Sequence, residues 1–137
     1  MKLIRFGVSL QDVLIKKFDR LIKKKKYSNR SEAIRDLIRR ELVQEEIKSD
    51  QQVAGVLNIL FDHHKTSMSD KLNSIQHDYF HNIISSTHIH LDHDNCLEVI
   101  ILKGKSKDIR EISDRIIAIK GVKHGELSMT SLGKKLI

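Results

Sequence analysis

The sequence predicts an α+β protein of two parts, a strand and two helices in residues 1–49 and a β-α-β-β-α-β unit in residues 50–137. Three observations lead to this fold class. They are an alternating apolar pattern at the N-terminus, two helical stripes after it, and a second series of strand and helix periodicities beyond residue 50. With 137 residues, 39% of them hydrophobic, the chain can form the cores of two small domains.

Basic residues and histidines are divided unequally between the two parts. Residues 1–49 contain 14 Lys and Arg against 7 Asp and Glu, whereas residues 50–137 contain 11 of each. All 8 histidines lie at or after His63. This division indicates two different tasks, although a basic excess by itself is also typical of a solvated surface.

Features of membrane and secreted proteins are missing from the sequence. No stretch approaches the roughly 18 consecutive apolar residues of a membrane span, and the N-terminus lacks the apolar core of a secretory signal. The single cysteine, Cys96, cannot form an internal disulfide. We therefore expect a cytoplasmic protein with no membrane partner, whose thiol is available for packing, metal binding or chemistry.

Residues 1–10 predict a short strand with one apolar face, because apolar residues alternate with other residues along it. The apolar positions are Ile4, Phe6, Val8 and Leu10. The positions on the other face are Arg5, Gly7 and Ser9.

Two helices are expected after this strand. Asp12 can cap the first helix, and after the basic run Lys23–Lys26 the residues Tyr27 and Ser28 form a break. Asn29, with Glu32 three residues later, has the spacing of a capping box and predicts the start of the second helix. The apolar stripes are Leu14, Phe18, Leu21 and Ile22 in the first helix, and Ile34, Leu37, Ile38 and Leu42 in the second.

A unit of this size cannot bury an adequate core alone, and a lone strand leaves its backbone groups unpaired. Pairing with a second copy would form an antiparallel ribbon, which fits the major groove of B-DNA. There Arg5 can reach the O6 and N7 atoms of guanine. The start of the second helix at Asn29 suits a backbone phosphate, with Arg30 and Arg35 nearby.

The second part has the strand and helix order of a ferredoxin-like sheet, a fold that hosts many functions. The expected elements are strand Val53–Phe61, helix Met68–Ile84, strands Thr87–Leu91 and Leu97–Lys103, helix Ser106–Ile119 and strand Lys123–Met129.

A hairpin in this part predicts a metal site. His88 and His90 lie two residues apart on one strand, so their imidazoles share a face. The polar turn Asp92–Asn95 then brings Cys96 back toward them at the start of the next strand. Each of these residues alone has an ordinary explanation, since a lone cysteine is usually a small buried hydrophobe. A His-x-His pair and a cysteine seldom occur together on one hairpin by chance.

A fourth ligand is expected from the preceding helix. His77 is the candidate and His81, one turn later, is its rival, while Gln76 and Glu98 lie near enough to orient ligands. Three imidazoles and a thiolate suit zinc in a tetrahedron, and also Ni(II) or Cu(II) in a square plane. Surface positions or weak secondary metal sites are expected for His63, His64, His93 and His124.

These residues carry two resemblances. The segment Asn29–Arg35 is similar to the start of the second helix in ribbon-helix-helix DNA-binding modules. Over essentially the whole chain, the sequence resembles the nickel-responsive transcriptional regulators, in which such a module is joined to an ACT-like regulatory domain that tetramerises. The matching segments are Gln76-His77, His88-Ile89-His90, Cys96-Leu97-Glu98 and Lys120–Gly125.

The resemblance implies site residues and their roles. One square-planar Ni(II) per subunit would be bound by His88, His90 and Cys96 of one subunit and His77 of another. The implied DNA contacts are Arg5 and Ser9 for bases, Asn29, Arg30 and Arg35 for phosphates, and Lys65 from the regulatory domain. Gly7 departs from the family, which usually has a side chain at that reading position. A cation site between the domains would use Glu32, Asp36 and the carbonyl groups of Ile117, Ile119 and Val122.

The implied function is a nickel-dependent repressor that is not an enzyme. It would be a homotetramer, a dimer of dimers, that binds double-stranded operator DNA and takes no small organic substrate. A regulator of the same build that responds to zinc, copper or cobalt is the first alternative. A metal-dependent hydrolase is the second, although four protein ligands leave no open position for water. An antitoxin or amino-acid-responsive regulator with the same DNA-binding module is the third, and it would not need Cys96.

Overall fold

A computed structural model of the chain describes residues 1–62 and 64–137, and of Thr66 it describes the backbone only. The prediction made for His63 lies outside these residues. The chain divides into two compact units, Met1–Glu41 and Leu42–Ile137. This division falls inside the long helix Arg30–Lys48, and the domain boundary predicted between residues 49 and 50, just after that helix, stays a prediction.

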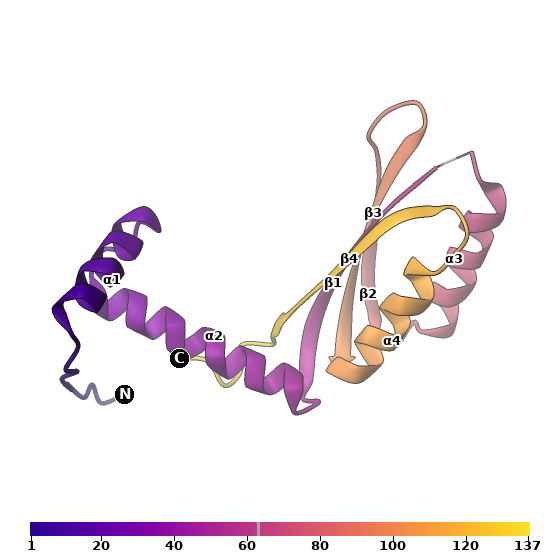
Figure 1. Ribbon diagram of the computed structural model, residues 1–137. Coiled ribbons are helices and arrows are strands. Elements are labelled where there is room, and N and C mark those ends of the chain that lie inside the picture. Colours follow the sequence, from indigo (N-terminus) through magenta and orange to yellow (C-terminus); the bar gives the residue numbers. More distant parts are fainter. Residues whose placement is uncertain (63) are drawn as a thin grey trace. The chain divides into compact units, whose positions relative to one another are not determined.

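Unit 1 contains helix α1 (Asp12–Lys24) and the start of helix α2 (Arg30–Lys48) (Figure 1). The predicted strand over residues 1–10 is absent from the single chain, where this segment has no regular structure. Its apolar side chains are exposed, from 97% at Met1 to 43% at Leu10. A strand requires a neighbouring strand for its backbone hydrogen bonds, and the described part of one chain offers none to this segment.

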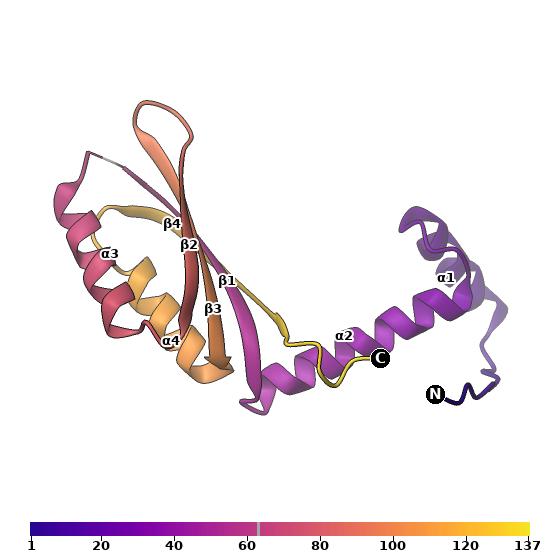
Figure 2. The same cartoon turned by 180° about the vertical axis from the view of Figure 1, so that it is seen from behind.

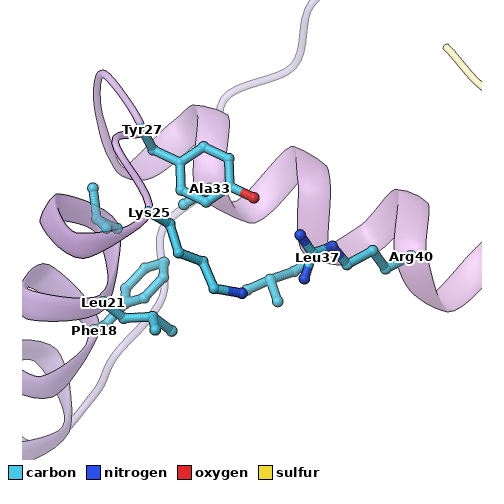
Figure 3. Close-up of a pocket in the computed structure, with 8 residues that line it drawn as sticks. Phe18, Leu21, Lys25, Tyr27, Ala33, Leu37 and Arg40 are labelled. Carbon is cyan, nitrogen blue, oxygen red and sulfur yellow. The ribbon is translucent and has the colours of Figure 1, made fainter. Parts of the chain in front are cut away.

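The turn between α1 and α2 forms as the capping pattern predicts. The side-chain Oδ1 of Asn29 accepts a 2.9 Å hydrogen bond from the backbone N–H of Glu32. The Tyr27 hydroxyl donates a hydrogen bond to the carboxylate of Asp36. Figure 3 shows a hollow between the two helices into which Phe18, Leu21, Tyr27 and Leu37 converge.

The core of unit 1 is small within one chain. Among its apolar residues, only Ile22 and Ala33 are buried. Two residues of the predicted α2 stripe, Leu37 and Ile38, remain about half exposed, at 48% and 49%. Unit 1 therefore leaves apolar surface that a second copy could cover.

Unit 2 is a four-stranded antiparallel sheet in the order β2-β3-β1-β4, with two helices on one face of the sheet (Figures 1 and 2). This is the predicted ferredoxin-like arrangement. Its elements are β1 (Gln52–Asp62), α3 (Thr66–Asp78), β2 (Ile83–His90), β3 (Asn95–Lys105), α4 (Ser106–Ile117) and β4 (Val122–Ser131).

Alternation along the central strands builds the core beneath the helices. On β1, every second side chain is buried, including Val53, Leu57, Ile59 and Phe61. The buried positions of α4, among them Ile109, Ile112 and Ile116, belong to the same cluster. The last turn of α2 also belongs to unit 2, because Ile47 packs on this core and its carbonyl accepts a 2.6 Å hydrogen bond from Ser106.

The predicted helix Met68–Ile84 is wrong at its C-terminal end. Helix α3 ends at Asp78, and residues from Ile83 onward belong to β2. The backbone N–H of Lys103 donates to the carbonyl of Asn82, and the Asn82 amide donates to the carbonyl of Lys103. These two bonds pair Asn82, the residue before β2, with Lys103 of β3. A tertiary contact therefore starts a strand where the sequence predicts the last turn of a helix.

None of the helices in the described part of the chain combines the length and apolar character needed to cross a membrane.

Candidate metal centre

Three predicted ligands meet on the β2–β3 hairpin. The strand register places His90 directly opposite Cys96 and His88 directly opposite Glu98. The ligand atoms of His88, His90 and Cys96 all lie within 4.8 Å of one another. The Cys96 Sγ is 3.3 Å from the Nδ1 of His90, and the two imidazole rings are 5.0 Å apart. The side chains therefore already converge in the single chain.

Asp92 shapes the turn that sets this register. Its Oδ1 accepts hydrogen bonds from the backbone N–H groups of Asp94 and Asn95, at 2.9 and 2.8 Å. The side-chain amide of Asn95 donates to both Asp92 oxygens at 3.0 Å. Asn95 also accepts a hydrogen bond from Lys123 of β4. Hydrogen bonds within the turn and from β4 thus fix the hairpin tip, and this keeps His90 opposite Cys96.

Glu98 lies where it can orient His88. Its carboxylate Oε2 is 3.0 Å from the Nδ1 of His88, and the residue is only 7% exposed. If Nδ1 is protonated and its N–H donates a hydrogen bond to the carboxylate, the lone pair of Nε2 remains available to a metal. The T-shaped contact between the rings of Phe61 and His88, 5.5 Å between centroids, supports the imidazole from β1.

The chemistry of the donor set fits a borderline metal ion such as Ni(II), Zn(II) or Cu(II). Cys96 is fully buried, and burial raises the pKa of its thiol, with the carboxylates of Asp62, Asp92 and Glu98 adding to the effect. A bound metal cation would lower the pKa of this thiol again, because it stabilises the thiolate and neutralises the surrounding negative charge. Two imidazoles and this thiolate can supply three coordination positions.

The fourth predicted ligand, His77, is an exposed residue near the end of α3. It does not join the group of His88, His90 and Cys96 among the described residues of one chain. Its neighbour Gln76 has a buried side-chain nitrogen, Nε2, that finds no hydrogen-bond partner in the described part of the chain. The rival, His81, is exposed and stacks on Phe80.

The residues expected to bind DNA are exposed. Arg5, Gly7 and Ser9 lie in the irregular N-terminal segment, and Lys65 directly precedes α3. Arg30 forms a bidentate pair with Asp19, with both bonds 2.9 Å long. Arg35 pairs with Glu32 at 2.9 Å. The two arginines thus have acidic partners within the chain, and Asn29 caps α2 as described above.

The residues of the predicted interdomain cation site are distributed over the two units. Glu32 and Asp36 belong to unit 1, whereas Ile117, Ile119 and Val122 belong to unit 2. Asp36 pairs with Arg40 at 3.1 Å in addition to its bond from Tyr27. The carbonyl of Ile119 accepts the backbone N–H of Val122. The site itself stays a prediction.

The structure brings together a second group of candidate ligands that the sequence does not predict as a group. His64, His93 and Asp94 also place one ligand atom each within 4.8 Å of one another. The sequence predicts surface positions or weak secondary metal sites for the two histidines separately, and it predicts no ligand role for Asp94. The adjacent histidine and carboxylate of His93 and Asp94 are a sequence signal for metal binding. Their approach to His64 depends on the pairing of β1 with β3, which has no local signal.

Each of the two units matches a known protein family. Residues 54–130 match the family "NikR C terminal nickel binding domain", and residues 4–45 match "Ribbon-helix-helix protein, copG family". A solved structure of the uncharacterized protein TM1266 from Thermotoga maritima is similar in fold, with a TM-score of 0.52. It is 15% identical and the match covers 58% of this chain and 98% of that one, which supports the fold alone.

Relatives of full length share about half of the residues. A protein of Thermococcus kodakarensis is 52% identical over 100% of both chains. One of Nitratidesulfovibrio vulgaris (strain Miyazaki F) is 54% identical over 97% of this chain and 96% of its own. Both bear the name "Putative nickel-responsive regulator". This chain therefore belongs to the family of nickel-responsive regulators, in which a ribbon-helix-helix segment precedes the NikR C-terminal domain.

Proposed function

We propose that the protein is a nickel-dependent transcriptional repressor that binds double-stranded operator DNA when Ni(II) is bound at His88, His90 and Cys96. The observation that carries the proposal is the convergence of these three ligand atoms within 4.8 Å, in a chain of this family. The protein would act in the cytoplasm, where the chromosome lies, and would not be an enzyme or bind an organic substrate.

His77 of a neighbouring subunit would complete the coordination. Two features of the single chain support a neighbour there, the exposed His77 and the unpartnered Nε2 of Gln76 beside it. In addition, β2 is an edge strand that exposes Ile84 and Ile89. Three imidazoles and a thiolate would give Ni(II) a square plane, one ion per subunit, and zinc, copper or cobalt is the alternative.

The DNA-binding surface would be a ribbon formed by residues 1–10 of two subunits. The exposed apolar side chains of this segment and of α2 support such a pairing. Arg5, Gly7 and Ser9 would then face the major groove. Nothing lies within 4 Å of a Cβ built at Gly7, so the family's usual side chain is missing there without a steric reason.

Phosphate contacts would come from the start of α2, at Asn29, Arg30 and Arg35. Because Arg30 and Arg35 are paired with Asp19 and Glu32, they would have to exchange these partners or share them with phosphates. Lys65 would add a contact from the second domain.

A metal shared between subunits would couple nickel binding to the assembly of a homotetramer, a dimer of dimers. For the ion to act as co-repressor, it must favour the DNA-binding arrangement by a coupling free energy, typically about 1–3 kcal/mol. A cation between Glu32, Asp36 and the carbonyl groups of Ile117, Ile119 and Val122 would further restrain that arrangement. It would replace the bonds that Arg35, Tyr27 and Arg40 now make to the two carboxylates.

The proposal is tested by adding Ni(II) to the metal-free protein while its binding to its own promoter DNA is followed by fluorescence anisotropy. We expect a thiolate-to-nickel charge-transfer band to rise with occupancy and DNA binding to tighten at least about tenfold, equivalent to about 1.4 kcal/mol. Zn(II) serves as the comparison. Equal tightening by zinc would refute the nickel dependence, and unchanged binding with either metal would refute the repressor switch.

A further inference from the structure

The last turn of α2 is bonded to the first turn of α4 at a junction formed by Ile47, Asp50, Gln51, Ser106 and Lys107, called the α2–α4 junction below. The Ser106 hydroxyl donates a 2.6 Å hydrogen bond to the carbonyl of Ile47 and lies 3.3 Å from the Oδ1 of Asp50. The backbone N–H of Ser106 donates to the carbonyl of Gln51 at 3.2 Å, and that of Lys107 donates to the Oδ1 of Asp50 at 2.9 Å. Ser106 is only 5% exposed, so its bonds are largely protected from water.

Asp50 closes one helix and caps the other. The first N–H groups of a helix have no partner within it, and Lys105, the residue before α4, provides no side-chain cap. Asp50 provides that cap to Lys107 from a distant part of the sequence. Its own backbone is left-handed, with φ at 54°, and the next N–H, of Gln51, donates to the carbonyl of Glu46 at 3.0 Å. Glycine is the usual residue at such a helix end, so the carboxylate at this position serves α4 as well.

The other end of α4 contacts the helix that carries His77. Helices α3 and α4 lie side by side on one face of the sheet (Figures 1 and 2). The guanidinium carbon of Arg115, in the last turn of α4, is 5.7 Å from the centroid of the Tyr79 ring. Tyr79 is the residue that ends α3, two positions after His77, and it packs against the same core as the buried residues of α4. One helix therefore contacts both the end of α3 and the end of α2.

We propose that the α2–α4 junction transmits the state of the nickel site to the DNA-binding unit, with Asp50 and Ser106 as positioning residues. This inference rests on the nickel-dependent repressor proposed above. When His77 takes part in nickel binding, the end of α3 becomes restrained, and α4 passes that restraint to the junction. Because α2 runs unbroken from Arg30 to Lys48, fixing its last turn limits the directions in which the helix can leave the sheet. A flexible linker at this point would absorb the displacement instead.

The test compares Asp50→Gly with the unmodified protein. Glycine accepts the left-handed backbone at this position, so the variant removes the carboxylate without straining the helix end. The measurement is the ratio of the dissociation constants for promoter DNA without and with Ni(II). We expect a ratio of at least about ten in the unmodified protein and below about three in Asp50→Gly. The thiolate-to-nickel band and the amount of bound Ni(II) should be the same in both, which also shows that the metal domain is folded.

Three further variants separate positioning from a general loss of stability. Asp50→Asn keeps an oxygen that can accept the Lys107 N–H, so it should retain the full ratio. Asp108→Ala is the matched control, because it removes an exposed carboxylate from the same first turn of α4, and it should also retain the ratio. Ser106→Ala breaks the junction from the α4 side and should lower the ratio as Asp50→Gly does. Combining Ser106→Ala with Asp50→Gly should add little, since the two residues belong to one hydrogen-bonded group.

The outcomes distinguish a failure of the junction from a failure of the nickel switch. The full ratio in Asp50→Gly with an intact band would overturn the role of the junction and leave the switch in place. Loss of the band in Asp50→Gly would also overturn it, because the junction would then maintain the metal site itself. A ratio near one in the unmodified protein would refute the switch, and with it the signal that the junction is proposed to transmit.

Discussion

Glu98 approaches the Nδ1 of His88 to 3.0 Å from the neighbouring strand, and it is almost completely buried. A buried carboxylate is costly unless it has a partner, and a protonated Nδ1 provides one. The same contact leaves the Nε2 of His88 as the nitrogen that can bind a metal. A single pairing across the hairpin thus accounts for both the buried acid and the orientation of a ligand.

Replacing Glu98 should weaken nickel binding without removing a ligand. We expect Glu98→Ala to lower the affinity for Ni(II) about 10- to 100-fold, the usual effect of losing a group that orients a metal-bound histidine. Competition with a chelator of known affinity measures this change. Glu126→Ala on β4 is the control, because Glu126 is exposed and belongs to neither ligand group. Equal affinities of the two variants would contradict the role given to Glu98.

Two substitutions at Asn29 should separate its structural role from its proposed phosphate contact. Asn29→Ala removes the cap of α2 and should lower the free energy of unfolding by about 1 kcal/mol. Asn29→Asp keeps a capping oxygen, so stability should be retained, while the new negative charge should weaken DNA binding. Urea unfolding and DNA anisotropy measure the two effects. Normal DNA binding by Asn29→Asp would exclude a phosphate at this helix start.

The pair between Asp19 and Arg30 predicts a pH dependence. The hydrogen bond and charge of Arg30 hold the pKa of Asp19 below its usual value of 3.8. A lowered folded-state pKa means that the stabilising contribution is full above the ordinary pKa and is lost as the pH falls through the lower folded-state value. The difference in unfolding free energy between the unmodified protein and Asp19→Asn should therefore be present at neutral pH and disappear in acid. A difference that does not change with pH would rule out this pair as its source.

Mixing two inactive variants should restore nickel sites if His77 acts from a neighbouring subunit. His77→Ala and Cys96→Ser each lack one ligand of every site. When the two variants are unfolded and refolded together, subunits of the two kinds come into contact. Each contact between unlike subunits forms two sites, and one of these sites has both an intact His77 and an intact Cys96. Random mixing then predicts that roughly a quarter of the thiolate band returns. Absence of the band from the mixture would place all four ligands within one subunit or exclude His77.

The hairpin site could be predicted from sequence because its determinants are local. A period of two places His88 and His90 on one face, and the Asp92–Asn95 turn brings Cys96 back to them. The end of α3 could not be predicted, since the apolar residues near Ile83 suit a helix or a strand, and the contact of Asn82 with Lys103 decides between them.

Long-range pairing accounts for the other differences. The meeting of His64 with Asp94 follows from the register of β1 against β3, which joins segments about 30 residues apart and leaves no local signal. The alternating apolar pattern predicts the N-terminal strand, but the hydrogen-bond partner of this strand would be another copy of the chain. The single chain therefore leaves residues 1–10 without regular structure.

The central claim is that a metal at the β2–β3 hairpin controls DNA binding, and Cys96→Ser tests it most directly. The measurement is the ratio of the dissociation constants for promoter DNA without and with Ni(II), determined for the unmodified protein and for this variant. We expect a ratio of at least about ten for the unmodified protein and a ratio near one for Cys96→Ser, with equal DNA binding of the two metal-free proteins. The same ratio in both proteins would contradict the account.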